Sequence, residues 1–373
     1  MRFLLDTEQH AFADTLNAML TAADTPSVVR DWSRGEHASG RALWRRIAEA
    51  GVFALAVPEA YDGMGPLPVE LTVVFVELGR HAVPGPLVET VAAAALLAAL
   101  DDRAPAKRLL PALASGTSVA TLATGPYTLD ADMADVRLTL AAPAQALSAR
   151  PAFEDKAPSG PKQGSGGGSP QDGTGRGGGG AASISGSAAG NSAPTELRLA
   201  PPPAGPPHLS LDPARRLFPT LRDGELLATV PHLTPALTWA RLATAAQALG
   251  VGLALLDRTV TYVRQRTQFG VPIGSFQAVK HQLADAKIAL EFARPLLFGA
   301  ALTMTEQDVA AAKVTACEAA YATARTALQL HGAIGYTAEY DLSLWLTKAR
   351  ALRTAWGTPD ECRAAVLSDG RRW

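Results

Sequence analysis

The chain has 373 residues, of which 47% are hydrophobic and 18% charged, so it is long enough for two or three domains with a substantial core. Its net charge of −1 gives no reason to expect nucleic acid or an anionic membrane as a partner. Its 2 cysteines cannot form a disulfide framework. The most apolar run, residues 91–100, is too short to span a bilayer. We therefore expect a cytoplasmic protein.

The first part of the chain is predicted to be an α-helical domain over residues 1–117. Apolar residues recur there at the spacing of one helix face, and alanine, a strong helix former, dominates them. Residues 5–34 are expected to be helical, with Thr7 as N-cap. Further helices are expected in the stretches 39–52, 68–81 (ending near Gly79), 88–100 and 105–116.

The sequence pattern changes from helical to strand-like in residues 118–230, where we predict a reduced β middle domain. Short runs of β-branched residues, SVATLATG and VRLTLA, alternate with turn signals. Residues 157–193 hold 13 of the 33 glycines and almost nothing apolar to bury. Such a stretch cannot recover its ordering entropy and is predicted to be a flexible insertion. It lacks the GxxxxGK[ST] pattern of a phosphate-binding loop.

Residues 231–373 show the clearest helical pattern and predict an antiparallel four-helix bundle with helices of about 30 residues. Small residues in the third seam favour close helix approach, and Pro295 is expected to kink or end the second helix. The predicted seam positions are Ala246, Leu249, Leu253, Leu256, Val260 and Val263, then Phe276, Val279, Leu283, Ala286, Leu290, Ala293 and Leu297, then Val309, Ala312, Ala316, Thr323, Ala327 and Leu330.

A polar stretch, RTQFGVPIGSFQ at 266–277, separates the first two long helices. An arginine, aromatic rings and amides in a short turn suit a planar ligand that carries phosphate, because a guanidinium pairs with phosphate oxygens. Composition alone favours the simpler interpretation of a tight loop with a surface arginine. The candidate ligand-facing residues are Arg266, Gln268, Phe269, Ile273, Phe276 and Gln277.

Two further polar stretches follow. QLHGAIGYTAEYDL, from residue 329, has glycines that fit a helix C-terminus, and a single histidine there is more often a hydrogen-bonded core residue than a catalyst. TAWGTPDE at 354–361 is either a helix end at Gly357 or a loop whose glycine lets the backbone approach a ligand. No spacing of His, Cys and carboxylates suggests a metal site.

Taken in order, RTQFGVPIGSFQ, QLHGAIGYTAEYDL and the final WGT resemble the C-terminal half of the acyl-CoA dehydrogenase family. The stretch LWRRIAEAGVFALAVPEAYDGMGPLPVELTVVFVELGRHAVPGPLVET resembles its helical N-terminal domain, and LDPARRLF at 211–218 resembles the end of its middle domain. The resemblance covers roughly residues 5–120 and 209–367. It implies a mainly α fold: a helical domain, a small β-barrel, here reduced, and a four-helix bundle.

The resemblance also implies FAD as cofactor. By this resemblance, the residues chosen in 266–277 face the adenine and pyrophosphate part of FAD. The segment Gln329, Leu330, His331, Gly332 and Ala333 does so across a dimer interface, and Thr358 and Asp360 lie near the flavin. The family desaturates acyl-CoA thioesters in fatty-acid or sterol degradation, so an acyl-CoA substrate is implied.

The chain departs from the family where the catalytic base is expected. Most members place a glutamate immediately before the Gly-Thr, and here that position is Trp356. Others place it on the first bundle helix, where Ala240 stands beside a retained Arg241. Neither residue can accept a proton, so no catalytic residue is assigned. The family's TEP…GSD stretch is replaced by ATLATGPYTLDADMAD, which leaves fewer flavin and acyl-CoA contacts.

The leading hypothesis is a base-less subunit of a heteromeric acyl-CoA dehydrogenase. It would form a heterotetramer with a base-bearing chain, which would bind most of the acyl-CoA. The alternatives are a self-sufficient homodimer or homotetramer with a relocated base, and a flavin-free structural paralogue. The empty base positions argue against the second hypothesis, and the retained RTQFG and QLHGA motifs argue against the third.

Overall fold

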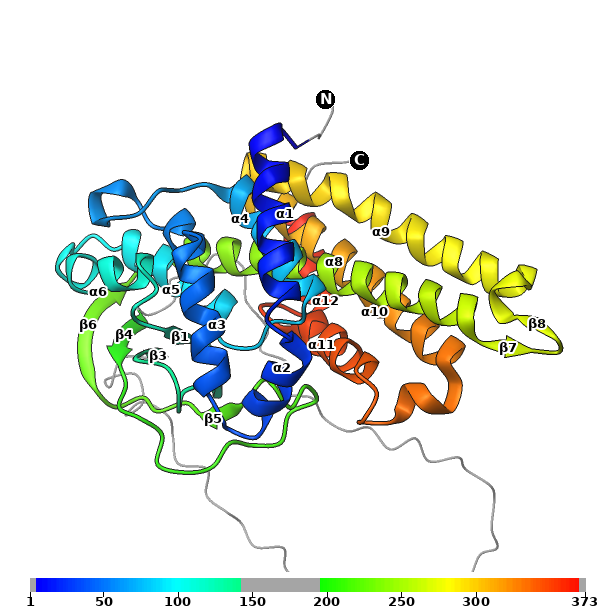
Figure 1. The fold of residues 1–373 in the computed structure, drawn as a ribbon. Coiled ribbons are helices and arrows are strands. Elements are labelled where there is room, and N and C mark those ends of the chain that lie inside the picture. Colours follow the sequence, from blue (N-terminus) through cyan, green and yellow to red (C-terminus); the bar gives the residue numbers. More distant parts are fainter. Residues whose placement is uncertain (1–4, 142–194, 369–373) are drawn as a thin grey trace, which may run out of the picture.

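The computed structural model describes residues 5–141 and 195–368 and shows a mainly helical molecule (Figure 1). The predicted insertion at 157–193 lies outside the described residues. The N-terminal part is a layer of helices with two short 3-10 turns between them. Its elements are α1 (Thr7–Thr21), α2 (Thr25–Ser33), α3 (Ala38–Glu49), η1 (Val52–Ala56), η2 (Glu59–Tyr61), α4 (Pro68–Arg80), α5 (Leu87–Ala98) and α6 (Ala104–Ala114).

The start of the chain differs from the prediction in two respects. Asp6, and not Thr7, is the N-cap of α1, because its carboxylate accepts a hydrogen bond from the backbone N–H of Gln9 at 2.8 Å. The Gln9 side chain accepts one from the Asp6 backbone at 3.1 Å, which completes a capping box. The single helix expected over 5–34 is two helices, because Asp24 has a φ of 45°, which interrupts the helical path.

The middle part consists of two small sheets. The larger has the strand order β1-β3-β4-β6, in which β1 and β3 are parallel and the other pairs antiparallel. The predicted runs SVATLATG and VRLTLA contain β1 and β3, in register with Leu122 opposite Leu138. The strands are β1 (Ala120–Ala123), β3 (Val136–Ala141), β4 (Thr195–Leu199) and β6 (Glu225–Val230), with β2 (Tyr127–Leu129) and β5 (Leu217–Pro219) forming the second sheet.

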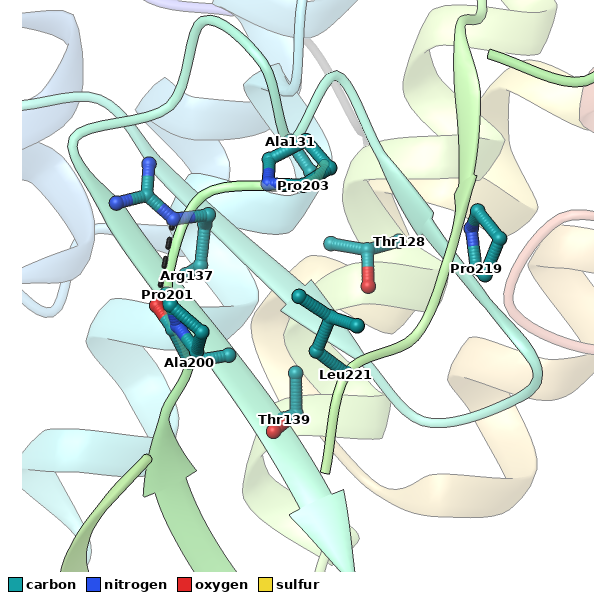
Figure 2. A pocket seen from close by; sticks show the side chains of 9 residues that line it. All are labelled: Thr128, Ala131, Arg137, Thr139, Ala200, Pro201, Pro203, Pro219 and Leu221. Carbon is teal, nitrogen blue, oxygen red and sulfur yellow. Dashed lines mark hydrogen bonds between the residues drawn. The ribbon is translucent and has the colours of Figure 1, made fainter. Parts of the chain in front are cut away.

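A small cavity remains inside this middle part (Figure 2). Its volume is about 10 Å³, which is enough for roughly one water molecule. Thr139 lines it, and the hydroxyl of this residue has no hydrogen-bond partner among the described residues. Arg137, on the same strand, donates to the carbonyl of Ala200 at 3.3 Å. The cavity is therefore a place for water and too small for a flavin or an acyl chain.

The C-terminal part is a bundle of long antiparallel helices that ends in a short helix. The predicted bundle is confirmed, and its three longest helices have 32, 27 and 26 residues. The elements are α8 (Thr234–Gln265), β7 (Thr267–Gln268), β8 (Val271–Pro272), η3 (Ile273–Ser275), α9 (Gln277–Thr303), α10 (Glu306–His331), η4 (Gly332–Tyr336), α11 (Leu342–Thr354) and α12 (Pro359–Leu367). Pro295 does not end α9, which continues to Thr303.

The helix α8 lies at the centre of the molecule and contacts both the N-terminal layer and the bundle. It is long and apolar enough to cross a membrane, but 89% of its most apolar window is buried inside the protein, which identifies it as a core helix. Gly79 of α4 and Gly250 of α8 allow the two backbones to meet. A Cβ at these positions would lie 2.1 Å from the carbonyl oxygen of Gln247 and 1.9 Å from that of Val76.

Buried carboxylates also link distant parts of the chain. The indole of Trp32 in α2 donates to Asp130, after β2, at 3.0 Å. Asp130 is fully buried, its second carboxylate oxygen has no partner among the described residues, and burial raises the pKa of its carboxyl to about 8. Asp212 pairs with Lys348 of α11 at 3.1 Å, and both side chains are almost fully buried. These contacts connect the middle part to α2 of the N-terminal layer and to α11 of the bundle.

The raised pKa of Asp130 predicts that this carboxyl makes the fold less stable as pH rises. The folded chain keeps the proton of the Asp130 carboxyl up to about pH 8, whereas the unfolded chain releases it above about pH 3.8. The stability that this carboxyl contributes is therefore complete below about pH 3.8 and is lost as pH rises towards about 8. Asp130→Asn keeps an acceptor for Trp32 and tolerates the positive φ of 49°. In urea unfolding, we expect the stability of this variant relative to wild type to increase between pH 5 and pH 8, by at most about 1.4 kcal/mol per pH unit.

The matched control is Asp223→Asn at an exposed position. Its stability difference from wild type should be the same at pH 5 and pH 8. A difference for Asp130→Asn that is independent of pH would contradict the prediction.

Candidate functional site

The turn after α11 contains Trp356 and Gly357. The helix ends at Thr354, before Gly357, and both Trp356 and Gly357 then take positive φ angles of 57° and 132°. A Cβ on Gly357 would lie 3.2 Å from the sulfur of Cys362. The glycine is therefore required by the backbone conformation and by the close packing of α12, and it does not act as a simple helix C-cap.

Two buried cations hold the carbonyl groups of this turn. Arg241 of α8 is 8% exposed and donates through Nε to the carbonyl oxygen of Trp356 at 3.2 Å. Lys313 of α10 is fully buried and donates through Nζ to the carbonyl oxygens of Arg353, at 2.8 Å, and of Gly357. A helix C-terminus carries partial negative charge, so cations at this position stabilise it. These contacts reach main-chain oxygens, so they do not involve the side chain at position 356.

The side chain of Trp356 lies in the position expected for a catalytic base. It is partly buried and packs against the main hydrophobic core. Its indole nitrogen donates to Oε1 of Glu89, in the first turn of α5, at 3.2 Å. Ala240, the other expected base position, is fully buried beside Arg241. Neither position offers a proton acceptor.

Glu89, Arg215 and Lys313 were missed by the sequence interpretation. Glu89 is 4% exposed and forms an ion pair with Arg215 at 3.5 Å. A signal was present, because Glu89 is the single charged residue in the apolar helix LVETVAAAALLA. Arg215 belongs to the motif LDPARRLF, where sequence alone does not name its partner. Lys313 lies among alanines in α10 and gave no signal for a buried cation.

The thiols near the turn are not candidates for nucleophilic chemistry. Cys317 and Cys362 are both buried. Burial raises the pKa of the Cys317 thiol to about 11 and also raises that of Cys362. A thiol reacts as its thiolate, which is scarce at neutral pH under these conditions.

Thr358 and Asp360 form the N-terminal end of α12. The hydroxyl of Thr358 caps the helix by accepting from the backbone N–H of Glu361 at 3.2 Å, and the Glu361 carboxylate accepts from the Thr358 backbone at 2.7 Å. Asp360 is exposed and pairs with Arg363 at 3.0 Å. Both predicted flavin-facing residues therefore have local structural roles in this turn.

The predicted ligand-facing residues of 266–277 form an exposed hairpin between α8 and α9 (Figure 1). Phe269 is 91% exposed and lies edge-on to Phe276, with ring centroids 6.2 Å apart. Arg266, Gln268 and Gln277 are also exposed, whereas Ile273 is partly buried. The hairpin thus offers a guanidinium, amides and two aromatic rings to a ligand or to a second chain.

The end of α10 lies beside the base of this hairpin. The ring of His331 stacks on Tyr262 of α8 with centroids 4.1 Å apart. Nδ1 of His331 donates to the carbonyl of Ala327 at 2.7 Å, and burial lowers the pKa of the ring, so Nε2 is an unprotonated acceptor. Nε2 is buried without a partner among the described residues. Leu330 is partly buried, and the neighbouring residues Gln329, Gly332 and Ala333 are exposed.

The structure brings 266–277 and 329–333 together but separates both from the turn at Trp356. Arg241, which binds that turn, and Arg266 lie on the same helix. Their 25-residue separation corresponds to about 38 Å at 1.5 Å per residue. One chain therefore presents the two predicted parts of the candidate site at opposite ends of its bundle.

A helical layer, a small β part and a long antiparallel bundle define the class as acyl-CoA dehydrogenase-like. A family model described as acyl-CoA dehydrogenase, N-terminal domain, matches residues 6–117, and one described as acyl-CoA dehydrogenase, C-terminal domain, matches residues 232–368. The chain belongs to the acyl-CoA dehydrogenase family. The stretch between these two matches contains the reduced β part and the residues that the structure does not describe.

Individual relatives agree with this assignment. Acyl-CoA dehydrogenase IpdE2 of Mycobacterium tuberculosis is 29% identical over 97% of each chain. Bovine mitochondrial short-chain specific acyl-CoA dehydrogenase is 37% identical, over 34% of this chain and 32% of its own length. Butyryl-CoA dehydrogenase from Megasphaera elsdenii has the same fold, with a TM-score of 0.76 and 19% identity over the whole of both chains. The Mycobacterium tuberculosis ChsE4-ChsE5 complex also has this fold, with a TM-score of 0.73 and 22% identity over 100% and 98% of the chains.

The family's cofactor is FAD, and the hairpin end of this chain has residues that fit it. Arg266 is a suitable donor for phosphate oxygens, and the exposed phenyl rings suit a planar group. The buried Nε2 of His331 is an acceptor that lacks a partner among the described residues. The turn at the other end fits less well, because Thr358 is engaged in a helix cap and an indole replaces the carboxylate.

The two carbonyl contacts of Lys313 predict a clear loss of stability for Lys313→Met. This change keeps the length and apolar stem of the side chain but leaves carbonyl groups near α12 without a donor. We expect the free energy of unfolding to fall by roughly 1–3 kcal/mol in urea titrations. The control is Lys287→Met at an exposed position of α9. Equal losses for the two variants would show that the buried ammonium does not stabilise the turn.

Proposed function

We propose that this chain is a base-less subunit of a heteromeric acyl-CoA dehydrogenase and supplies flavin-binding surface to a base-bearing partner. The observation that carries the proposal is the turn after α11, whose main chain is held by two buried cations but which presents Trp356 where the family resemblance places a carboxylate. FAD supplies the hydride acceptor for α,β-desaturation of the acyl-CoA. This chain contributes binding surface and contacts between subunits.

The missing base limits what the chain can do alone. The α-proton of a thioester is weakly acidic, so its removal needs a positioned base. The Trp356 indole donates a hydrogen bond to Glu89 and cannot accept a proton. Ala240 has no functional group and is fully buried. A homodimer or homotetramer would repeat these residues in every site, so a partner with its own carboxylate is favoured over self-association.

The positions of the flavin-facing residues support a shared site. Arg266 and His331 lie at the end of the bundle about 38 Å from the turn of the same chain. We propose that they contact the adenine and pyrophosphate of an FAD whose flavin ring lies in the partner. The partner would also bind most of the acyl-CoA, because the middle part of this chain lacks the family's TEP…GSD stretch.

The helix α9 offers a surface for such a partner. Ile288, Phe292 and Leu296 recur at a spacing of four residues and are 52%, 70% and 48% exposed. Large apolar side chains on one helix face form a stripe that is normally covered by another element. The fold also occurs in a structure described as the ChsE4-ChsE5 complex, which is consistent with assembly from two different chains.

A second candidate, a self-sufficient enzyme with a relocated base, rests on one observation. Glu89 is a buried carboxylate in hydrogen-bond contact with Trp356. Its Oε1 already accepts from both Trp356 and Arg215, which is typical of a structural anchor. A flavin-free paralogue is the third candidate, and the exposed hairpin with Arg266 and Phe269 argues against it.

We expect the lone chain to be unable to desaturate acyl-CoAs. The chain is purified alone and together with the chains encoded beside it, and the flavin spectrum of each preparation is recorded. Anaerobic mixing with a panel of acyl-CoAs should leave flavin oxidised in the lone chain and bleach it in the mixed complex.

Trp356→Glu alone should restore little activity, because the middle part still lacks its acyl-CoA contacts. Bleaching by the lone wild-type chain at an enzymatic rate, on the order of 1–1000 per second, would contradict the proposal.

Arg266→Ala should weaken FAD binding in whichever assembly holds the flavin. A charge-assisted hydrogen bond to phosphate is worth roughly 1.5–3 kcal/mol, so a loss of about tenfold or more is expected. The dissociation constant is measured by flavin fluorescence during titration of the apoprotein. Arg264→Ala, another exposed arginine two positions earlier, is the matched control and should leave affinity unchanged. Equal affinities for both variants would remove Arg266 from the flavin site.

A further inference from the structure

Glu89 is a buried acid in an otherwise apolar helix. It is 4% exposed and lies in the first turn of α5. A buried carboxylate is unfavourable unless charged or polar partners compensate for the loss of water. Its position in the fold therefore requires an explanation beyond helix propensity, and its partners supply one.

Two donors converge on one oxygen of Glu89 from different parts of the molecule. Arg215, in the segment before β5, approaches Oε1 through Nη2 at 3.5 Å and is itself largely buried. Trp356, in the turn after α11, donates from its indole nitrogen at 3.2 Å. The arginine balances the charge of the carboxylate, and the hydrogen bond from the indole N–H, together with packing on the core, orients the Trp356 ring.

The backbone of Trp356 is also fixed by a hydrogen bond. A bulky residue rarely adopts a positive φ, yet Trp356 has a φ of 57°. Arg241 donates to its carbonyl oxygen and Glu89 accepts from its side chain. Contacts at both ends of the residue, from α8 and from α5, fix one orientation of the indole.

We propose that Glu89 is a positioning residue that anchors the indole of Trp356 over the empty base position and thereby keeps this chain's own acyl site closed. The location of the acyl site rests on the proposed function. The anchoring itself rests on the contacts of Glu89 and is independent of any activity. Glu89 acts through Trp356 and is not assigned a role in proton transfer.

The anchoring is tested by ¹⁹F NMR of the chain labelled with 5-fluorotryptophan. The chain contains 6 tryptophans, and Trp356→Phe identifies the signal of residue 356. Glu89→Ala should shift or broaden this signal, whereas Glu89→Gln should leave it near its wild-type position, because the amide oxygen still accepts from the indole. Trp345, which donates from its indole nitrogen to the carbonyl oxygen of Arg80 at 2.9 Å, is an internal control whose signal should not move. An unchanged Trp356 signal in Glu89→Ala would overturn the proposal.

A second variant covers the case in which Glu89→Ala fails to fold. Trp356→Phe keeps the bulk of the ring and the Glu89–Arg215 pair but removes the indole N–H. Hydrogen–deuterium exchange of the amides of residues 354–358 should become faster in this variant, while α10 remains unchanged. Exchange equal to wild type in 354–358 would show that the indole contact does not hold the turn.

Closure of the site is tested with octanoyl-CoA as the probe. Trp356→Ala, which removes the ring that closes the site, should bind octanoyl-CoA at least about tenfold more tightly than wild type. Equal affinities of the variant and the wild type for octanoyl-CoA would contradict the proposal that the indole closes the acyl site. These results are distinguishable from a failure of the proposed function, because that failure would appear as flavin bleaching by the unmodified lone chain.

Discussion

The contact of two buried cations with the carbonyl groups after α11 is the constraint on which the candidate site depends. Arg241 and Lys313 bind main-chain oxygens of this turn, and these contacts do not involve the side chain at position 356. On the proposed function, these contacts are the reason why the turn can keep its shape with an indole in place of a glutamate.

The length of the bundle helices determines how the site is divided. Arg266 is placed far from Trp356 because α8 is a continuous 32-residue helix. Antiparallel packing then returns the end of α10 to the same end as Arg266, where His331 stacks on Tyr262. The chain therefore presents one half of the candidate site at each end of the bundle. This division is the basis for proposing assembly with a second chain, and Trp356 at the expected base position is the reason for proposing that the second chain is different.

Local periodicity was sufficient to predict the bundle, most of the N-terminal helices and the strands β1 and β3, because each of these follows from residues three, four or two positions apart, but it did not predict the break at Asp24 that divides the first helix. The local pattern left open whether Pro295 would kink or end the second helix, and tertiary packing decides that α9 continues to Thr303. The position of Trp356 followed from family resemblance, but its partner did not. Glu89 lies 267 residues away in the chain, and no local pattern connects the two.

The close approach of α4 and α8 has a consequence for exchanging parts between relatives. Gly79 and Gly250 meet backbone atoms of the opposing helix, so neither position has room for a side chain. A chimera that takes its N-terminal helices from one family member and its bundle from another will assemble well when both parents carry glycine at these two positions. Where one parent carries a larger residue, the two parts will be held apart, and the shared core will not close.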